Sequence, residues 1–201
     1  MPSSSEDIIG LYQRHASTWD KDRTRSLFEK AWLDRFLAIA GHNASILDLG
    51  CGMGEPIARY LIEQGCSVTG VDTSHTFIDL CRNRFPDQEW IVGDMRNRVP
   101  GKQFQGVLAW DSFFHLNHAD QRGMFSVFRR YAAPKAALLF TSGSSYGEAI
   151  GEYQGDPLYH ASLDTAEYES LLQEQGFEVV SHVVDDATCG HHTVWLARLN
   201  R

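Results

Sequence analysis

The stretch that decides the fold runs from Ile46 to Gly54 and reads ILDLGCGMG. It begins as an apolar strand with one acidic residue, Asp48, and continues into a turn with glycine at every second position. Glycine lets the backbone turn tightly and lets a ligand approach closely, because it has no Cβ. A helical pattern follows over residues 57–62 and stops at Gly65. We therefore expect a strand, a ligand-binding turn and a helix in this order.

Short apolar runs alternate with helical patterns around this turn, which is typical of a parallel sheet covered by helices on both faces. A short link over residues 185–192 joins the last two strands and predicts an antiparallel hairpin. The expected strands are residues 45–49, 67–72, 89–92, 106–110, 136–141, 177–184 and 193–199. This pattern predicts an α/β fold with a doubly wound, mostly parallel, seven-stranded sheet.

Two regions lie outside the regular alternation. Two amphipathic helices are expected before the first strand, and residues 142–162 show no clear periodicity. The chain of 201 residues has no internal repeat and no linker, and its length is typical of one domain. We expect residues 1–201 to form a single domain.

Charge and composition exclude several classes of function. The formal net charge is −8, which argues against nucleic acid as a partner. The charge is uneven, because residues 136–197 hold ten acidic residues and no Lys or Arg. No run approaches the roughly 20 apolar residues that span a bilayer, and Met1 to Asp7 lacks the regions of a secretion signal. We expect a cytoplasmic protein with no membrane partner, whose four cysteines are free thiols.

The ligand of the glycine-rich turn is not expected to be a phosphate. The dinucleotide pattern GxGxxG from Gly50 needs a small residue where this chain has Glu55, which would repel a pyrophosphate. Asp72 ends the second strand, where a carboxylate accepts hydrogen bonds from both ribose hydroxyls, or else caps the next helix. Asp94 and Met95 end the third strand and suit the edge and face of an adenine ring, unless Asp94 only stabilises a turn. These strand ends predict a pocket for an uncharged adenosine.

The run from Ile46 to Met95 resembles the class I S-adenosylmethionine-dependent methyltransferases, whose first motif is acid-x-Gly-x-Gly-x-Gly. The matching residues are Asp48, Gly50, Gly52 and Gly54. The resemblance implies a Rossmann-like fold and S-adenosyl-L-methionine as the cofactor. It also implies a lid of N-terminal helices within residues 1–41, a cofactor-binding half at residues 45–95 and an acceptor-side half at residues 105–201. The sulfonium and ammonium of this cofactor favour carboxylates over the basic side chains that hold phosphates.

The resemblance also implies roles for individual residues. Asp48 would orient the methionyl amino group, Asp72 would hold the ribose hydroxyls, and Asp94 with Met95 would frame the adenine. Tyr12 belongs to the expected lid, although an ordinary amphipathic helix explains it equally well. The full set of expected cofactor-binding residues is Tyr12, Trp19, Asp48, Gly50, Cys51, Gly52, Gly54, Asp72, Thr73, Asp94, Met95 and Asp111.

The candidate catalytic residues follow the fourth strand. Asp111 comes directly after that strand, where the family often places a residue that faces the sulfonium or the acceptor. His115 lies in the next loop, and the ordinary pKa of histidine suits a proton acceptor near pH 7; a packing histidine is an equal alternative. No metal is expected, because Cys189, His191 and His192 lack a fourth ligand at suitable spacing.

The predicted function is transfer of a methyl group to an O, N or S atom of a small-molecule acceptor, by a monomer or homodimer. In this family the segment after the fifth strand, here Tyr146 to His160, often sets acceptor specificity. One alternative is a nicotinamide-dependent oxidoreductase on a related sheet, which Glu55 and the lack of a Tyr-x-x-x-Lys pair disfavour. The other alternative is a non-catalytic protein that only binds S-adenosylmethionine. The same sequence features are expected in such a protein.

Overall fold

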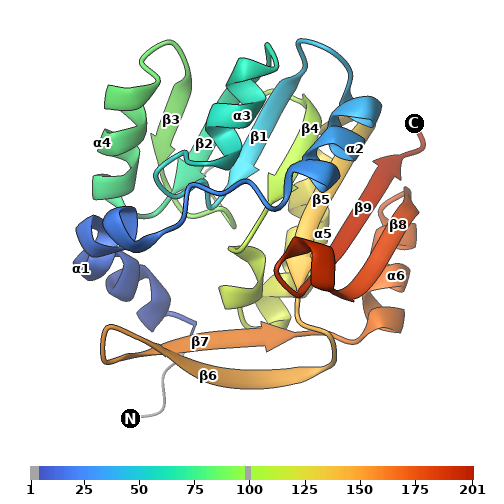
Figure 1. Cartoon of the computed structure of the whole chain (residues 1–201). Helices are drawn as coiled ribbons and strands as arrows, with labels where there is room; N and C mark the ends of the chain where they lie inside the picture. Colours follow the sequence, from blue (N-terminus) through green and yellow to red (C-terminus); the bar gives the residue numbers. More distant parts are fainter. Residues whose placement is uncertain (1–4, 98–100) are drawn as a thin grey trace.

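The structure is a computed structural model that describes residues 5–97 and 101–201 (Figure 1). The first four residues of the Met1–Asp7 stretch therefore lie outside the described residues. Within these two ranges, no helix has the length and apolar character needed to cross a membrane.

A single seven-stranded sheet forms the centre of the molecule, in the order β3-β2-β1-β4-β5-β9-β8. Its strands are β1 (Ser45–Leu49), β2 (Ser67–Asp72), β3 (Glu89–Val92), β4 (Phe104–Ala109), β5 (Ala132–Ser142), β8 (Phe177–Asp186) and β9 (His192–Leu199). Strands β1 to β5 are parallel, and β9 runs antiparallel to both β5 and β8. The predicted mostly parallel sheet with an antiparallel C-terminal hairpin is confirmed.

Helices cover both faces of this sheet. They are α1 (Asp7–Asp22), α2 (Lys30–Ala40), α3 (Ile57–Glu63), α4 (His75–Arg84), α5 (His118–Tyr131) and α6 (Thr165–Glu174). Apolar residues of α2, α3 and α4 pack on one face, and those of α5 and α6 pack on the other. Successive strand residues point to opposite faces of the sheet. Ile46 therefore packs in the core beneath α2, α3 and α4, and Leu47 packs in the core beneath α5 and α6. Full burial of one such side chain contributes roughly 1.5–3 kcal/mol.

The two N-terminal helices have different positions. Helix α2 buries Trp32, Leu33 and Phe36 in the core, against β4, β5 and β9. The expectation that both N-terminal helices form a lid is therefore wrong for α2, whose apolar face is part of the core. Helix α1 alone lies at the carboxyl ends of the parallel strands, beside α4 (Figure 1).

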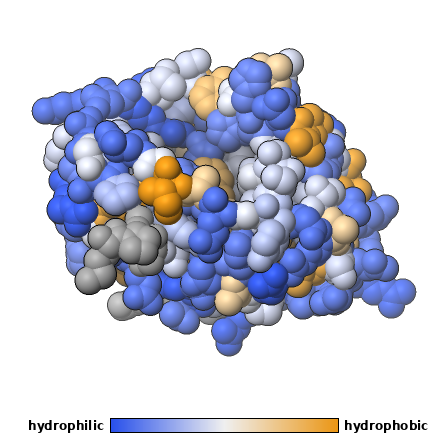
Figure 2. Space-filling view, turned by 90° about the horizontal axis from the view of Figure 1, so that it is seen from below, coloured by the Kyte–Doolittle hydropathy of each residue, from blue (hydrophilic) through white to orange (hydrophobic). Residues whose placement is uncertain are grey.

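The segment without periodicity is a β-hairpin, which the sequence did not predict. It consists of β6 (Gly147–Tyr153) and β7 (Asp156–Ser162), paired antiparallel from Gly147–Ser162 to Tyr153–Asp156. Strand β6 has no buried residue, so it lacks the alternation of apolar and polar side chains that marks a half-buried strand. The hairpin spans the end of the sheet beneath the parallel strands in Figure 1. Figure 2 shows this face of the molecule as largely hydrophilic, with isolated hydrophobic residues.

Contacts with α1 hold the hairpin and the helix together. Asp156 accepts hydrogen bonds from Arg14 and His15 of α1, both at 2.8 Å. Ile8 of α1 packs with Tyr159 and Ala161 of β7 in a small separate core. Helix α1 and the hairpin thus form one cover at the end of the sheet where the parallel strands finish.

Candidate functional site

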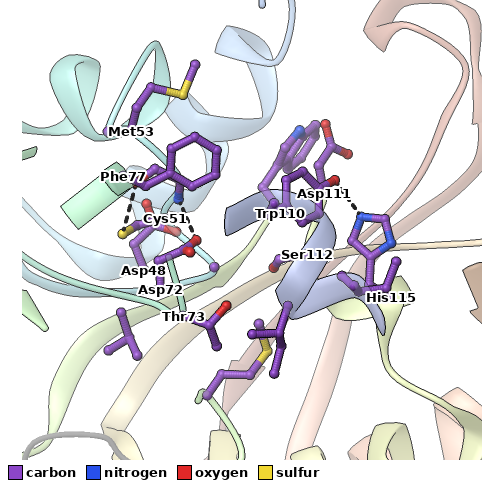
Figure 3. Close-up of a pocket in the computed structure, with 18 of the residues that line it drawn as sticks. Asp48, Cys51, Met53, Asp72, Thr73, Phe77, Trp110, Asp111, Ser112 and His115 are labelled. Atoms are coloured by element: carbon purple, nitrogen blue, oxygen red, sulfur yellow. Dashed lines mark hydrogen bonds between the residues drawn. The ribbon is translucent and has the colours of Figure 1, made fainter. Parts of the chain in front are cut away.

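A cavity with an open volume of about 1040 Å³ lies at the carboxyl ends of β1 to β4, beneath α1. Ligands of open α/β sheets bind at this edge, beyond the carboxyl ends of the strands. The cavity is lined by every cofactor-binding and catalytic residue that the sequence predicts, from Tyr12 on α1 to His115 after β4. In Figure 3, Asp48 and Asp72 lie on one side of the cavity, and Asp111 and His115 lie on the other.

The three glycines of the turn all have positive φ angles, but they are needed for different reasons. A Cβ on Gly50 would lie 2.2 Å from Cβ of Ser112, and a Cβ on Gly54 would lie 3.0 Å from the ring of Phe85. A Cβ on Gly52 would meet no protein atom within 4 Å. Gly50 and Gly54 are therefore required by packing, whereas Gly52 leaves its space to the cavity.

Two carboxyl groups face the cavity beside this turn: Asp48, which is buried, and Asp72, which is half-buried. Asp72 accepts hydrogen bonds from the backbone N–H groups of Gly52 at 3.0 Å and Ser74 at 2.9 Å. Burial raises the pKa of Asp72, and burial together with the negative charge of Asp72 raises the pKa of Asp48 to about 7. The sequence alternative that Asp72 caps the next helix is wrong, because Ser74 is the N-cap of α4. The pair forms a local acidic site that a cationic ligand would stabilise.

Asp94 lines the cavity but is already paired. Arg96 donates to both carboxylate oxygens of Asp94 through Nε at 3.0 Å and also through its backbone N–H at 2.9 Å. Burial opposes ionisation, but the hydrogen bonds of Arg96 outweigh it and lower the pKa of Asp94. The turn-stabilising role that the sequence left open for Asp94 is therefore present, and an adenine amino group would share this carboxylate with Arg96.

The carboxylate of Glu55 is surrounded by arginines, so the predicted repulsion of a phosphate by Glu55 is weakened. Glu55 precedes α3, whose N-cap is Pro56. Its carboxylate lies 3.0 Å from Nε of Arg25 and 2.6 Å from Nε of Arg59, and Arg84 is 3.6 Å away. Because these arginines compensate its charge, repulsion of phosphate by Glu55 is weak. Exclusion of a phosphate rests instead on Asp48 and Asp72.

His115 is a buried, neutral imidazole. Its Nδ1 lies 2.8 Å from the carbonyl oxygen of Tyr159, which only accepts, so Nδ1 carries the proton. Its Nε2 then accepts a hydrogen bond from the Tyr12 hydroxyl at 2.9 Å. Burial lowers the pKa of His115 to about 4. The expectation of an ordinary pKa is therefore wrong, because the side chain is 6% exposed and both ring nitrogens are occupied.

Asp111 has an unusual backbone and two cationic neighbours. Its φ is +50°, a left-handed conformation that aspartate tolerates better than most residues. Its N–H donates to Oγ1 of Thr141 at 2.9 Å. The carboxylate lies 2.8 Å from Nε2 of His192 and 3.5 Å from Nη2 of Arg23. The sequence did not associate His192 with Asp111, because 81 positions separate them.

A second, more open cavity of about 1440 Å³ lies beside the first, between the hairpin β6–β7, the end of β5 and the β8–β9 connection. Tyr146 and His160, which the sequence assigned to the acceptor region, line it. Tyr153 lies elsewhere, with its ring 4.9 Å from that of Trp19 on α1. The hydroxyl of Tyr159 donates to Glu148 at 2.7 Å.

Several residues of the first cavity had no signal in the sequence. Ser112 donates to the carbonyl oxygen of Leu49 at 2.6 Å and so fixes the strand end beside Gly50. Phe77 and Met53 form an apolar wall with Ala16 of α1. These side chains come from distant parts of the chain, and only the fold brings them together.

A methyltransferase domain model matches residues 46–135 of the chain. Among curated proteins, the chain is 34% identical over 130 residues to dTDP-3-amino-3,6-dideoxy-alpha-D-glucopyranose N,N-dimethyltransferase of Streptomyces fradiae. That match covers 64% of this chain and 49% of the relative. The chain spans only 39–55% of the length of three such relatives.

Solved structures of methyltransferases share the fold. The 1,6-didemethyltoxoflavin-N1-methyltransferase of Burkholderia thailandensis, with S-adenosylhomocysteine bound, superposes with a TM-score of 0.73 at 19% identity, over 98% of this chain and 87% of that chain. An amino pentose methyltransferase of Micromonospora echinaspora, with S-adenosylmethionine bound, gives 0.70 at 17% identity, over 92% and 95%. At such identities the likeness concerns the fold.

Proposed function

We propose that the chain is a class I S-adenosylmethionine-dependent methyltransferase, which transfers a methyl group from S-adenosyl-L-methionine to an O, N or S atom of a small molecule. The methyltransferase domain model over residues 46–135 and the fold shared with solved methyltransferases support this proposal. The observation that carries the proposal is the pair Asp48 and Asp72. The carboxyl group of Asp48 is buried and that of Asp72 is half-buried at the cavity wall, and desolvation raises the pKa of each. Such a pair suits a ligand that brings a cation and hydrogen-bond donors.

The cavity fits this cofactor. The space beside Gly52 is open to a ligand, Asp48 is placed for the methionyl ammonium, and Asp72 has lone pairs left for the ribose hydroxyls. Met95 offers an apolar face for the adenine, while Asp94 would share its carboxylate between the adenine and Arg96. When bound, S-adenosylmethionine supplies a methyl group on a positively charged sulfur that leaves as a neutral thioether.

The residues of the chain contribute chiefly by position. Tyr12 and Trp19 cover the cavity from α1, which excludes water from the reacting groups. Holding two reactants in near-attack geometry can contribute roughly 7–11 kcal/mol. Asp111 is proposed as the catalytic residue that faces the transferred methyl group and the acceptor atom. His115, which accepts from Tyr12, is proposed to orient this cover, and direct proton transfer to His115 requires Tyr12 to move away.

The remaining parts of the proposal rest on the sequence. We propose that residues 1–201 act as one methyltransferase domain, as a monomer or homodimer in the cytoplasm. Nucleic acid is not proposed as the acceptor, because the net charge is −8 and residues 136–197 hold no Lys or Arg.

Thermal unfolding with three ligands tests the proposal. S-adenosylmethionine and S-adenosylhomocysteine are expected to raise the melting temperature in a concentration-dependent way, whereas NADH leaves it unchanged. Stabilisation by NADH alone would favour the oxidoreductase instead. Once an acceptor is found, release of S-adenosylhomocysteine separates an enzyme from a protein that only binds the cofactor.

A further inference from the structure

A second carboxyl group, Glu29, lies behind Asp111 and has no partner. Glu29 is fully buried, and neither of its carboxylate oxygens has a hydrogen-bond partner in the described part of the chain. Its charge interacts with Arg23, Asp111 and His192, which places it in the same cluster. A buried carboxyl group without a partner is costly and rare. Its presence here indicates that the cluster serves a purpose other than stability.

His192 fixes the orientation of Asp111 within this cluster. Its ring lies between those of Trp110 and Phe28, with centroid distances of 5.4 and 5.5 Å. Nε2 lies 2.8 Å from the Asp111 carboxylate, and Nδ1 lies 2.7 Å from the carbonyl oxygen of Cys189. Because both partners accept, the ring donates from both nitrogens and is positively charged. This hydrogen bond fixes the place of the Asp111 carboxylate.

The Asp111–His192 pair separates the two cavities. Asp111 lines the first cavity, and His192 lines the second. Among the described residues, the titratable groups that line the second cavity are Tyr146, Glu148, His160, Asp185, His191 and His192, and none is a Lys or Arg. A carboxylate or phosphate group entering here would meet the carboxylates of Glu148 and Asp185, while the charge of His192 is already paired with Asp111. The lining instead favours a neutral molecule or a cation.

Resting on the proposed function, we infer that the acceptor is an amine whose nitrogen lies at Asp111, and that His192 and Glu29 are positioning residues for this carboxylate. The lone pair of the neutral amine forms the new N–C bond, and the C–S bond breaks with its electron pair remaining on sulfur. The positive charge thereby passes to the nitrogen, and the ammonium product then releases its extra proton to solvent.

The carboxylate of Asp111 stabilises the charge that develops on this nitrogen. A hydroxyl acceptor would place different demands on the site, because it must lose a proton to become a strong nucleophile and develops no lasting positive charge. Burial and the charge of Asp111 raise the pKa of Glu29, and a positive charge that develops at Asp111 would favour its ionisation. This response suits the amine and opposes an alkoxide.

Sinefungin provides a direct probe of this charge, because it carries a primary amine in place of the methylsulfonium. Calorimetric titration of wild type is expected to show sinefungin binding at least tenfold more tightly than S-adenosylhomocysteine. Asp111→Asn is expected to reduce this ratio to about twofold or less, and His192→Ala and Glu29→Gln to reduce it several-fold. Glu169→Gln, an exposed acid on α6, removes the same charge and should leave the ratio unchanged.

The ratio separates positioning from general damage, since a loosened fold weakens both ligands alike. His192→Gln, which keeps an N–H donor for Asp111, should retain more of the ratio than His192→Ala. If wild type binds sinefungin no better than S-adenosylhomocysteine, or if Asp111→Asn keeps the ratio, the amine assignment is overturned while the proposed function stands. If wild type binds neither ligand, the proposed function fails and the amine assignment fails with it.

Discussion

The hydroxyl of Tyr12 donates to Nε2 of His115 across 2.9 Å and joins helix α1 to the loop that follows β4. The other ring nitrogen of His115 donates to the carbonyl oxygen of Tyr159 on β7. One buried imidazole thus connects the helix, the loop after β4 and the hairpin that together close the cavity. Its neutral state is a condition of this connection, because an imidazolium has no lone pair with which to accept from Tyr12.

His115 should make the protein sensitive to mild acid. Burial lowers its folded-state pKa to about 4, below the unfolded value of about 6.5, so the unfolded state binds more protons between these values. The stability that this histidine contributes is present above pH 6.5 and is lost as the pH falls toward 4, by up to about 3 kcal/mol. Urea unfolding of wild type and His115→Asn from pH 7.5 to 4.5 measures the difference, and parallel pH profiles would contradict this account.

His192 should show the opposite dependence. Burial opposes its protonation, but the hydrogen bond and charge of Asp111 outweigh it and raise the pKa of His192. The stabilisation by this pair is then fully present below the unfolded pKa of about 6.5 and is lost as the pH rises through the folded-state pKa. NMR titration of the imidazole is expected to show a lower pKa for His192 in Asp111→Asn than in wild type. An unchanged pKa would mean that Asp111 does not hold the charge of this ring.

Asp48 is expected to lower the stability of the folded protein at high pH, although its carboxylate contributes to cofactor binding. Its folded-state pKa of about 7 exceeds the reference value of 3.8, so stability falls as the pH rises from about 4 to 7, by up to about 4 kcal/mol. Asp48→Asn is expected to raise the melting temperature at pH 8 by roughly 5 °C or more. It should also weaken S-adenosylmethionine binding roughly 10- to 100-fold, because a charge-assisted hydrogen bond is lost. Loss of stability in Asp48→Asn at pH 8 would show that the carboxylate has a structural role instead.

Gly52 should be needed for the ligand and not for the fold. Its φ is +52°, and a Cβ here would project into open cavity space. Gly52→Val is expected to cost about 1–2 kcal/mol of backbone strain and to abolish measurable cofactor binding. Gly155→Val is a matched control, because Gly155 in the β6–β7 turn has φ +83° and equally open surroundings but does not line the cavity. Urea unfolding of both variants measures the cost of backbone strain, and calorimetric titration measures whether the new side chain blocks the cofactor. Cofactor binding by Gly52→Val at wild-type affinity would contradict the assignment of Gly52 to the cofactor site.

The parts of the fold that the sequence predicts are those that local pattern determines. The strand of Ile46 to Leu49 is an apolar run that enters a glycine turn, and the alternation of apolar runs with helical patterns predicts the parallel sheet. Strand β6 was missed because its side chains face solvent on both sides. Helix α2 was assigned to a lid because an amphipathic pattern shows that one face is buried but not what covers it.

The residues of the candidate site also fall into those that the sequence predicts and those that it does not. Asp48, Gly52 and Asp72 were found because they lie at the ends of neighbouring strands, which topology brings to one edge of the sheet. Glu29 and His192 were not placed beside Asp111, because contacts across 82 and 81 positions depend on tertiary packing. The pKa of His115 was misjudged for the same reason, since burial by Tyr12 and β7 is invisible in the local sequence.

The central claim is that the cavity beneath α1 binds S-adenosyl-L-methionine through the glycine turn and the ends of β1 and β2. Amide chemical shifts of the 22.7 kDa protein, followed by NMR as S-adenosylhomocysteine is added, test this most directly. The account predicts saturable shifts of the amides of Gly50, Gly52 and Thr73, with the amides of Val179 and Val183 on the far edge strand β8 unchanged. Saturation without shifts in the glycine turn, or no change in any amide at millimolar ligand, would contradict it.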